Sequence, residues 1–252
     1  MSPWEISIIA LAGFCSGVIK TGVGIGAGIF LLPTLALAFP AKTALGLGAP
    51  LMLASDVIGL RYYWRQWMSR SELMRIMLAA VPGLLAGTLL LPIIPADGFR
   101  MGVGIFGMAY AISHLFPGFA PVRWLKASLS SVNNCLEAKQ IYFYGAMGGA
   151  ATVLAHAGGL VWSLYLMTTV KDRRIFVGTL VLMFFITNTY KTIAYVTIGI
   201  LSIQELLAVL PAIPAVWLGS AIGNAANKHM NQEFFRKLVL AVIFIVAAKL
   251  CF

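Results

Sequence analysis

Four ionisable side chains fall inside long apolar stretches of this sequence. They are Lys20, Asp56, His156 and Lys191. A charge at the centre of a bilayer costs roughly 2.5 to 3.5 kcal/mol on insertion scales, so such groups usually face a cavity or a partner. Lysines can bind an anion, a carboxylate can pair with a lysine or carry a proton, and a histidine can donate a hydrogen bond or respond to pH. We therefore expect these residues to form a polar site within a membrane.

Lys20 and His156 stand at glycine-rich breaks in two of these stretches. Lys20 and Thr21 directly precede an alternating glycine run at 22–28, and His156 lies in a second break at 155–159. Each glycine costs a helix about 1 kcal/mol, so we expect the helices to unwind there. The half-helix after a break presents free N–H groups and the positive end of its dipole, which bind anions. Close packing of helices through small residues is the alternative reason for some of these glycines.

We expect an anion to bind between the two breaks. The predicted substrate-binding residues are Lys20, Thr21, Gly24, Gly26, Ser55, His156, Gly158, Thr187, Asn188 and Lys191. Asp56 pairs with one of the buried lysines, anchors Arg61 one turn on, or carries a proton, and it is the candidate for proton coupling. No metal or cofactor is expected, because the three histidines are scattered and no cluster of histidines and carboxylates accompanies them.

The composition places this site in an integral membrane protein. Of the 252 residues, 60% are apolar and 10% charged, and the mean hydropathy is +0.92, whereas a soluble domain is roughly half apolar and a quarter charged. The net charge of +10 comes from short basic clusters between apolar stretches, so it indicates membrane topology and not nucleic-acid binding. Three widely spaced cysteines give neither a disulfide framework nor a metal pattern.

Eight apolar segments follow one another along the chain. They cover about 5–38, 43–60, 73–94, 99–117, 140–170, 175–198, 206–223 and 234–252. Six have the length of one crossing of a bilayer core about 30 Å thick. The first and fifth are too long for one crossing and too short for two, and they contain the glycine breaks. We predict that these two segments form re-entrant hairpins or strongly broken helices.

An internal repeat relates the two halves of the sequence. With an ungapped offset of 132 residues, the following pairs align: Gly13/Gly145, Gly17/Gly149, Gly24/His156, Gly26/Gly158, Gly46/Gly178, Tyr63/Tyr195, Pro82/Pro214, Gly87/Gly219, Lys42/Arg174, Ser55/Thr187, Asp56/Asn188 and Thr88/Ser220. We therefore divide the chain into a first membrane repeat at 1–117, an interfacial linker at 118–139 and a second membrane repeat at 140–252.

The basic residues favour six spanning helices and two hairpins. If segments one and five enter and leave on the same side, one face collects 13 basic residues: Arg61, Arg65, Arg70, Arg75, Arg123, Lys126, Lys139, Lys171, Arg173, Arg174, Lys228, Arg236 and Lys237. The other face keeps Lys42, Arg100 and Lys249. The positive-inside rule makes the first face cytoplasmic and both termini periplasmic. Each half then crosses three times, so the halves are inverted, as in many secondary transporters.

The glycine motifs resemble those of a known family. The runs GFCSG at 13–17 and GVGIGAG at 22–28, then Pro33 and KTALG at 42–46, resemble the TauE/SafE family of sulfite and sulfonate exporters. The resemblance covers essentially the whole chain, because the second half carries a degenerate copy. This copy departs from the pattern at 155–159, which reads AHAGG, and the departure leaves the role of the second break less defined.

The resemblance implies a secondary transporter of small sulfur-containing oxyanions, exporting sulfite or an organosulfonate such as sulfoacetate across the inner membrane of a bacterium. Proton-coupled uptake of another small anion is the alternative. The expected partners are the anionic substrate and the lipid bilayer, with no nucleic acid, and a homodimer is left open.

Other classes of protein fit the sequence less well. An intramembrane hydrolase lacks a Gly-x-Ser-x-Gly elbow, and a metal-dependent membrane enzyme lacks clustered ligands, so no enzymatic activity is expected. A structural subunit does not need broken helices with polar tips. A cation transporter is the closest rival, but it is expected to have more than one deep carboxylate.

Overall fold

The computed structural model describes residues 3–22, 27–115 and 140–229, together with positions 241, 244, 245 and 248. Within these residues the fold is all-helical and contains no strand. The elements are α1 (Pro3–Gly22), α2 (Ala27–Leu35), α3 (Ala41–Tyr62), α4 (Arg70–Leu90), α5 (Ala96–Leu115), α7 (Gln140–Ala155), α8 (Gly158–Thr169), α9 (Arg173–Thr197), α10 (Ile203–Val209), the 3-10 helix η1 (Leu210–Ala212) and α11 (Ile213–His229). The predicted linker at 118–139 and last segment at 234–252 lie outside the described ranges, apart from the four isolated positions.

Five helical stretches of the described chain are long and apolar enough to cross a membrane. They are Pro3–Gly22, Ala41–Tyr62, Arg70–Leu90, Arg174–Thr197 and Ile203–Ala225. Their outer surfaces are apolar as well. On α4 an exposed stripe at helical spacing consists of Met74, Leu78, Val81, Leu85 and Leu89. Lipid covers such a stripe without penalty, so the protein is a multi-pass membrane protein, as its composition predicts.

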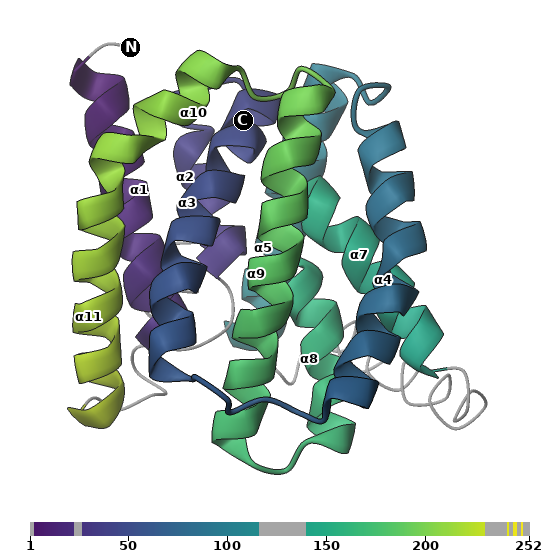
Figure 1. Cartoon of the computed structure of the whole chain (residues 1–252). Helices are drawn as coiled ribbons and strands as arrows, with labels where there is room; N and C mark the ends of the chain where they lie inside the picture. Colours follow the sequence, from purple (N-terminus) through teal and green to yellow (C-terminus); the bar gives the residue numbers. More distant parts are fainter. Residues whose placement is uncertain are drawn as a thin grey trace.

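The two over-long segments each fold as a pair of helices separated by a break. In the first, the 20-residue α1 precedes the 9-residue α2, and in the second the 16-residue α7 precedes the 12-residue α8. In Figure 1, α2 returns toward the end of the bundle at which α1 begins, and α8 returns toward the opposite end. Both segments are therefore broken helical hairpins. α1 by itself is long enough to span a bilayer. The two helices of the first hairpin therefore differ more in length than the sequence suggests.

The helix pairs follow the repeat. An offset of 132 residues places α1 on α7 and α4 on α10–α11, and the structure packs α1 against α11 and α4 against α7. Aligned glycines lie at both crossings. A Cβ at Gly17 would collide with the backbone of α11, and a Cβ at Gly149 with the backbone of α4. These two glycines, which lie outside the predicted breaks, therefore serve close helix packing.

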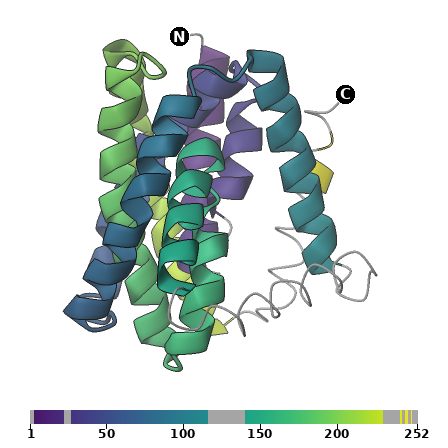
Figure 2. The same cartoon turned by 90° about the vertical axis from the view of Figure 1, so that its right-hand side faces the viewer.

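α3 and α9 occupy the centre of the bundle and pack against each other. They run in opposite directions, α3 downward and α9 upward in Figure 1. The view turned by 90° places α5 at one edge of the bundle (Figure 2), where it contacts α2 and α3. An inverted repeat predicts antiparallel central helices, and both the inversion and its orientation in a membrane stay predictions.

Two basic turns lie at the same end of the bundle. The turn between α3 and α4 packs on the start of α9, where the Met68 backbone N–H donates to Thr179 Oγ1 over 2.9 Å. The basic residues gathered near this contact are Arg61, Arg65, Arg70, Lys171 and Arg174. At the other end, the Lys42 ammonium donates to the Pro92 carbonyl over 3.2 Å. The described residues are therefore sorted between the two ends as the charge pattern predicts.

Local sequence fixes where the helices at this basic end begin. Asp172 caps α9 by accepting hydrogen bonds from the backbone N–H groups of Arg174 and Ile175. Ser69 caps α4 in the same manner, through the backbone N–H of Glu72. A short polar side chain before an apolar run satisfies N–H groups that have no partner within the helix. These caps hold the turns that set the positions of α3, α4 and α9.

Candidate functional site

The two breaks meet at the centre of the bundle. A Cβ at Gly28, near the start of α2, would collide with the backbone of His156 between α7 and α8. A Cβ at Gly48 of α3 would likewise collide with the His156 ring. Both positions need glycine because no side chain fits between the two breaks. The helix that follows the break beside Lys20 therefore lies in close contact with the backbone of His156.

His156 ends α7 in a backbone conformation that usually belongs to glycine. Its φ angle is 52°, and the backbone N–H of Ala157 donates to the Ala151 carbonyl over 3.1 Å. The backbone N–H of His156 also donates to the Thr152 carbonyl over 3.1 Å. This bond makes it an αL-type helix end, whose left-handed residue is most often glycine, and the aligned residue in the first half is Gly24. The contacts of the His156 side chain must therefore stabilise the fold by at least as much as the left-handed backbone conformation destabilises it.

The hydrogen bonds of the His156 imidazole indicate which ring nitrogen carries its proton. Nε2 lies 3.0 Å from the Leu45 carbonyl oxygen, which can only accept, so Nε2 carries the hydrogen. Nδ1 lies 2.6 Å from the Lys191 Nζ and accepts from the ammonium. His156 is thus a neutral link between α3 and α9, the two central helices.

Lys191 is fully buried and donates to neutral acceptors. Besides His156, its ammonium donates to the backbone carbonyl and the Oγ1 of Thr152, each over 3.2 Å. Its exposed fraction is 0%. Three N–H groups therefore meet three acceptors, and none of these acceptors carries a negative charge.

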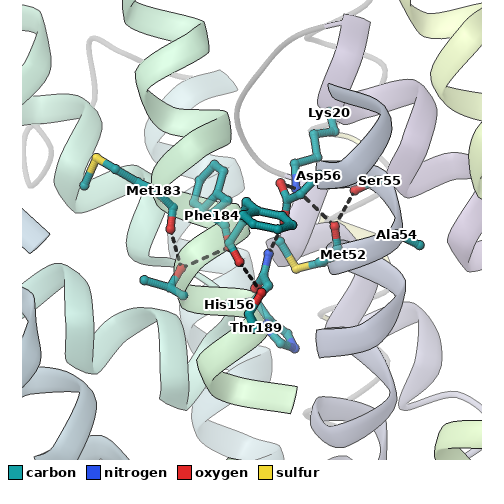
Figure 3. Close-up of polar contacts among 12 residues, drawn as sticks. Lys20, Met52, Ala54, Ser55, Asp56, His156, Met183, Phe184 and Thr189 are labelled. Carbon is teal, nitrogen blue, oxygen red and sulfur yellow. Dashed lines mark hydrogen bonds and ion pairs between the residues drawn. The ribbon is translucent and has the colours of Figure 1, made fainter. Parts of the chain in front are cut away.

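Lys20 and Asp56 form a buried ion pair next to this group. The second carboxylate oxygen of Asp56 accepts a 2.6 Å hydrogen bond from Asn188 Nδ2. Asp56 and Asn188 are aligned partners in the repeat, so their contact lies where the two halves meet symmetrically. The Lys20 ammonium also lies 5.1 Å from the ring centroid of Phe184, and Figure 3 shows it reaching toward Asp56 beside that ring.

A small cavity borders this cluster. Its lining is Lys20, Ala27, Gly28, Ile29, Met52, His156, Ala157, Gly159, Leu160 and Phe184. These residues include the first turns of α2 and α8, so two helix N-termini border the cavity. Such ends favour negative charge. Lys20 supplies the charged side chain of the lining and His156 the neutral polar one.

The buried ionisable groups do not match in number. Among the described residues, the cluster contains the amino groups of Lys20 and Lys191 and the single carboxylate of Asp56. A buried ammonium without a charged partner costs several kcal/mol, roughly, because it loses its hydration. An anion bound beside the cluster would supply a charged partner for the second lysine.

The structure brings together half of the predicted residues. Lys20, Asp56 and Asn188 form one linked group and His156 and Lys191 a second, and Lys20 and His156 both line the cavity. Ser55 lies beside them and donates to the Met52 carbonyl over 2.8 Å.

Other predicted residues serve the helices around the cavity. Thr21 donates to the Ser220 carbonyl over 2.7 Å and ties α1 to α11. Thr187 donates to the Met183 carbonyl of its own helix. Gly158 packs on α7, and the adjacent Gly159 lines the cavity. Gly24 and Gly26 lie outside the described residues.

Sequence reasoning missed Phe184 and Met52, which flank Lys20 in the cavity, and Thr152, which accepts from Lys191. Apolar residues in an apolar sequence carry no chemical signal. The repeat does carry a signal for these three residues, because the offset of 132 aligns Met52 with Phe184 and Lys20 with Thr152.

The fold and the site together define a multi-pass membrane protein with a cationic cluster between two broken helices. The family model described as Sulfite exporter TauE/SafE matches residues 9–250. The chain therefore belongs to the TauE/SafE sulfite exporter family, a family of membrane transport proteins. No curated protein and no solved structure matches the chain.

Proposed function

We propose that this protein is a secondary transporter that exports sulfite, or an organosulfonate such as sulfoacetate, across the inner membrane of a bacterium. The observation that carries this proposal is that two buried lysines share one carboxylate beside a cavity bordered by two helix N-termini. The residues share this arrangement with anion sites in general, and the family supplies the class of anion.

The substrate oxyanion binds at Lys20 and at the backbone N–H groups of the first turns of α2 and α8. Gly24 and Gly26 precede the first of these turns in the sequence and stay predicted members of the backbone part of the site. Lys191 acts from behind His156 and adds positive charge to the site. Asn188 holds Asp56, and Asp56 in turn holds Lys20.

Access alternates by rocking of the halves 1–117 and 140–252, which are inverted relative to each other. The contact between α3 and α9 supports this proposal, because it joins the halves at their aligned residues Asp56 and Asn188. The termini lie on the periplasmic side, and the end with Arg61, Arg65 and Lys171 is cytoplasmic.

Export needs no coupling ion. A monoanion that leaves an inside-negative compartment gains about 2.3 kcal/mol per 100 mV. Proteoliposomes loaded with sulfite should therefore release it faster than protein-free liposomes, and an inside-negative potassium diffusion potential should increase the rate. Equal release with and without the protein, for both sulfite and sulfoacetate, would rule out the proposal.

Proton-coupled uptake is the second candidate, and the Lys20–Asp56 pair favours it. An anion at Lys20 competes with the Asp56 carboxylate, so protonation of Asp56 would release Lys20 for the substrate. An inward proton gradient should then drive anion accumulation, and Asp56→Asn should abolish the response to that gradient. Anion accumulation that stays unchanged when the proton gradient is removed would exclude proton-coupled uptake.

A further inference from the structure

We propose that Tyr195 is a positioning residue that keeps the cavity closed toward one end of the bundle, the end at which α3 begins and α9 ends. It does so by holding the break between α7 and α8 in place, so that the ring of His156 lies across the path out of the cavity. This inference rests on the proposed alternating access and identifies what has to open on one side of the site.

Tyr195 supplies a hydrogen-bond donor that the end of α7 lacks. The backbone N–H of Ala157 turns back to the Ala151 carbonyl, so the Val153 carbonyl loses the donor that a continuing helix would give it. The Tyr195 hydroxyl donates to this carbonyl over 2.5 Å, and both residues have an exposed fraction of 0%. In the dry interior of a membrane protein such a carbonyl needs a partner, and Tyr195 provides it.

Tyr195 also orders the end of α9. Its carbonyl accepts from the backbone N–H of Ile200 over 2.9 Å, and the chain then packs on α3, where a Cβ at Gly46 would lie 3.0 Å from the Ile200 carbonyl oxygen. Leu45, the neighbour of Gly46, is the residue whose carbonyl lies 3.0 Å from His156 Nε2. The end of α7, the end of α9 and the second turn of α3 therefore form a closed ring of contacts.

This ring of contacts lies to one side of the cavity. On α3, Leu45 precedes the lining residue Met52 by about two turns. On α9, Tyr195 follows the lining residue Phe184 by about three turns. Because α3 and α9 run in opposite directions (Figure 1), both displacements point to the end at which α3 begins. His156 belongs to the cavity lining and to the ring of contacts, so its side chain stands between the two.

The closed and the open state depend on the Tyr195 hydroxyl to different degrees. In the closed state the Val153 carbonyl is buried and relies on that hydroxyl. Opening toward this end moves Leu45 away from His156 and admits water, which can donate to the carbonyl in its place. Loss of the hydroxyl therefore destabilises the closed state more than the open state and shifts the population toward the open one.

The effect is expected at one end of the bundle. His156 aligns with Gly24 of the first half, so the repeat supplies no second histidine for the opposite end. A change at Tyr195 should therefore alter access to the cavity from one face of the membrane and not from the other.

Side-selective thiol labelling tests the proposal. In a background without the native cysteines, Met52→Cys places a thiol in the cavity lining, where Met52 is 3% exposed, so a membrane-impermeant methanethiosulfonate reaches it when the site opens. Right-side-out and inverted vesicles present opposite faces to the reagent. Asp97→Cys marks the face at which α3 begins, because Lys42 at the start of α3 donates to Pro92 in the turn before α5.

Tyr195→Phe should speed labelling of Met52→Cys from the Asp97 face by about threefold to tenfold, the change in an equilibrium constant that one neutral hydrogen bond produces. Labelling from the other face should keep the wild-type rate. The matched control is Tyr190→Phe, which removes a hydroxyl of the same helix from its 3.0 Å contact with Thr88. Tyr190 lies outside the cavity lining, and its variant should keep the wild-type rates from both faces.

Gly46→Ala disturbs the same ring of contacts from α3. Its Cβ presses on the Ile200 carbonyl and should give the same one-sided increase, so the result does not depend on the folding of Tyr195→Phe alone. Labelling at the wild-type rate in both variants, or an equal increase from both faces in the folded proteins, would overturn the proposal. Wild-type proteoliposomes that release neither sulfite nor sulfoacetate would instead refute the proposed function, and the labelling rates do not depend on that result.

Discussion

At the scale of single residues, the cluster depends on how one carboxylate is shared. Asp56 contacts Lys20 through one oxygen and Asn188 through the other, and Lys191 relies on His156 and Thr152. Removal of Lys20 or Asp56 alone therefore leaves its buried partner without an opposite charge.

This sharing predicts a non-additive pair of substitutions. Lys20→Met and Asp56→Asn should each lower the free energy of unfolding by about 3 to 5 kcal/mol, because each leaves a buried charge without its partner. The double variant should be less destabilised than the sum of the two, since both charges are gone. Denaturant unfolding of the four proteins in detergent measures this, and additive losses would show that the two residues do not interact.

The backbone conformation and hydrogen bonds of His156 predict the order of stability of its variants. His156→Gly and His156→Ala both lose the hydrogen bonds to Leu45 and Lys191. Alanine also has to occupy the left-handed conformation, which costs roughly 1 to 2 kcal/mol for a residue with a Cβ. Thermal unfolding should rank the wild type first, His156→Gly second and His156→Ala last. An alanine variant as stable as the glycine variant would contradict the backbone assignment.

The charged members of the site could be predicted from the sequence, and the apolar ones could not. Lys20, Asp56, His156 and Lys191 stand out because a charge in an apolar segment needs a reason. Phe184 and Met52 do not, because 60% of the chain is apolar. Thr21 was predicted for the site from its place beside Lys20, but its hydroxyl bonds across to α11, a direction that no sequence pattern reveals.

At the scale of helices, the glycine positions divide into two groups with different roles. Gly28 and Gly48 allow the breaks to meet, whereas Gly17 and Gly149 allow whole helices to cross closely. The sequence indicates glycine breaks and a repeat, but it does not say which glycine belongs to which role. That assignment depends on which helix packs beside which, a tertiary property.

A matched pair of glycine substitutions tests the helix crossing. Gly149→Ala should lower the unfolding temperature, because its Cβ would collide with the α4 backbone and push apart the α4 and α7 pair. Gly102→Ala on α5 should leave stability unchanged or raise it slightly, since an added Cβ would meet no atom of the described residues within 4 Å beyond its own stretch of helix, and alanine favours helix. Equal effects of the two changes in detergent would argue against the close crossing.

At the scale of the whole molecule, the charge pattern and the helix directions have to agree on one orientation. Lys171 lies at the end with the basic turns, and Asp97 begins α5 at the other end (Figure 1). The all-helical membrane fold and its two broken hairpins could be read from composition and segment length. The break in the first segment falls at the predicted glycine run, between the end of α1 at Gly22 and the start of α2 at Ala27. The segment length did not reveal that α1 by itself is long enough to span a bilayer.

Cysteine labelling tests this orientation. In a background without the three native cysteines, a membrane-impermeant maleimide added to intact cells should label Asp97→Cys. Lys171→Cys should react after permeabilisation and not before. Both residues are exposed, so the reagent can reach them once it is on the correct side. The reverse pattern would invert the molecule, and labelling of both without permeabilisation would contradict the sorting of the two ends.

The central claim is that an anion crosses the membrane by binding at Lys20. The most direct measurement is sulfite and sulfoacetate flux in proteoliposomes that contain Lys20→Gln, with Lys171→Gln as the control at an exposed basic residue. Loss of a buried charged contact typically costs 2 kcal/mol or more, so flux of both anions should fall by at least about tenfold. The control should keep the wild-type rate, and Lys20→Arg should restore part of it. Wild-type flux in a folded Lys20→Gln protein would contradict the account.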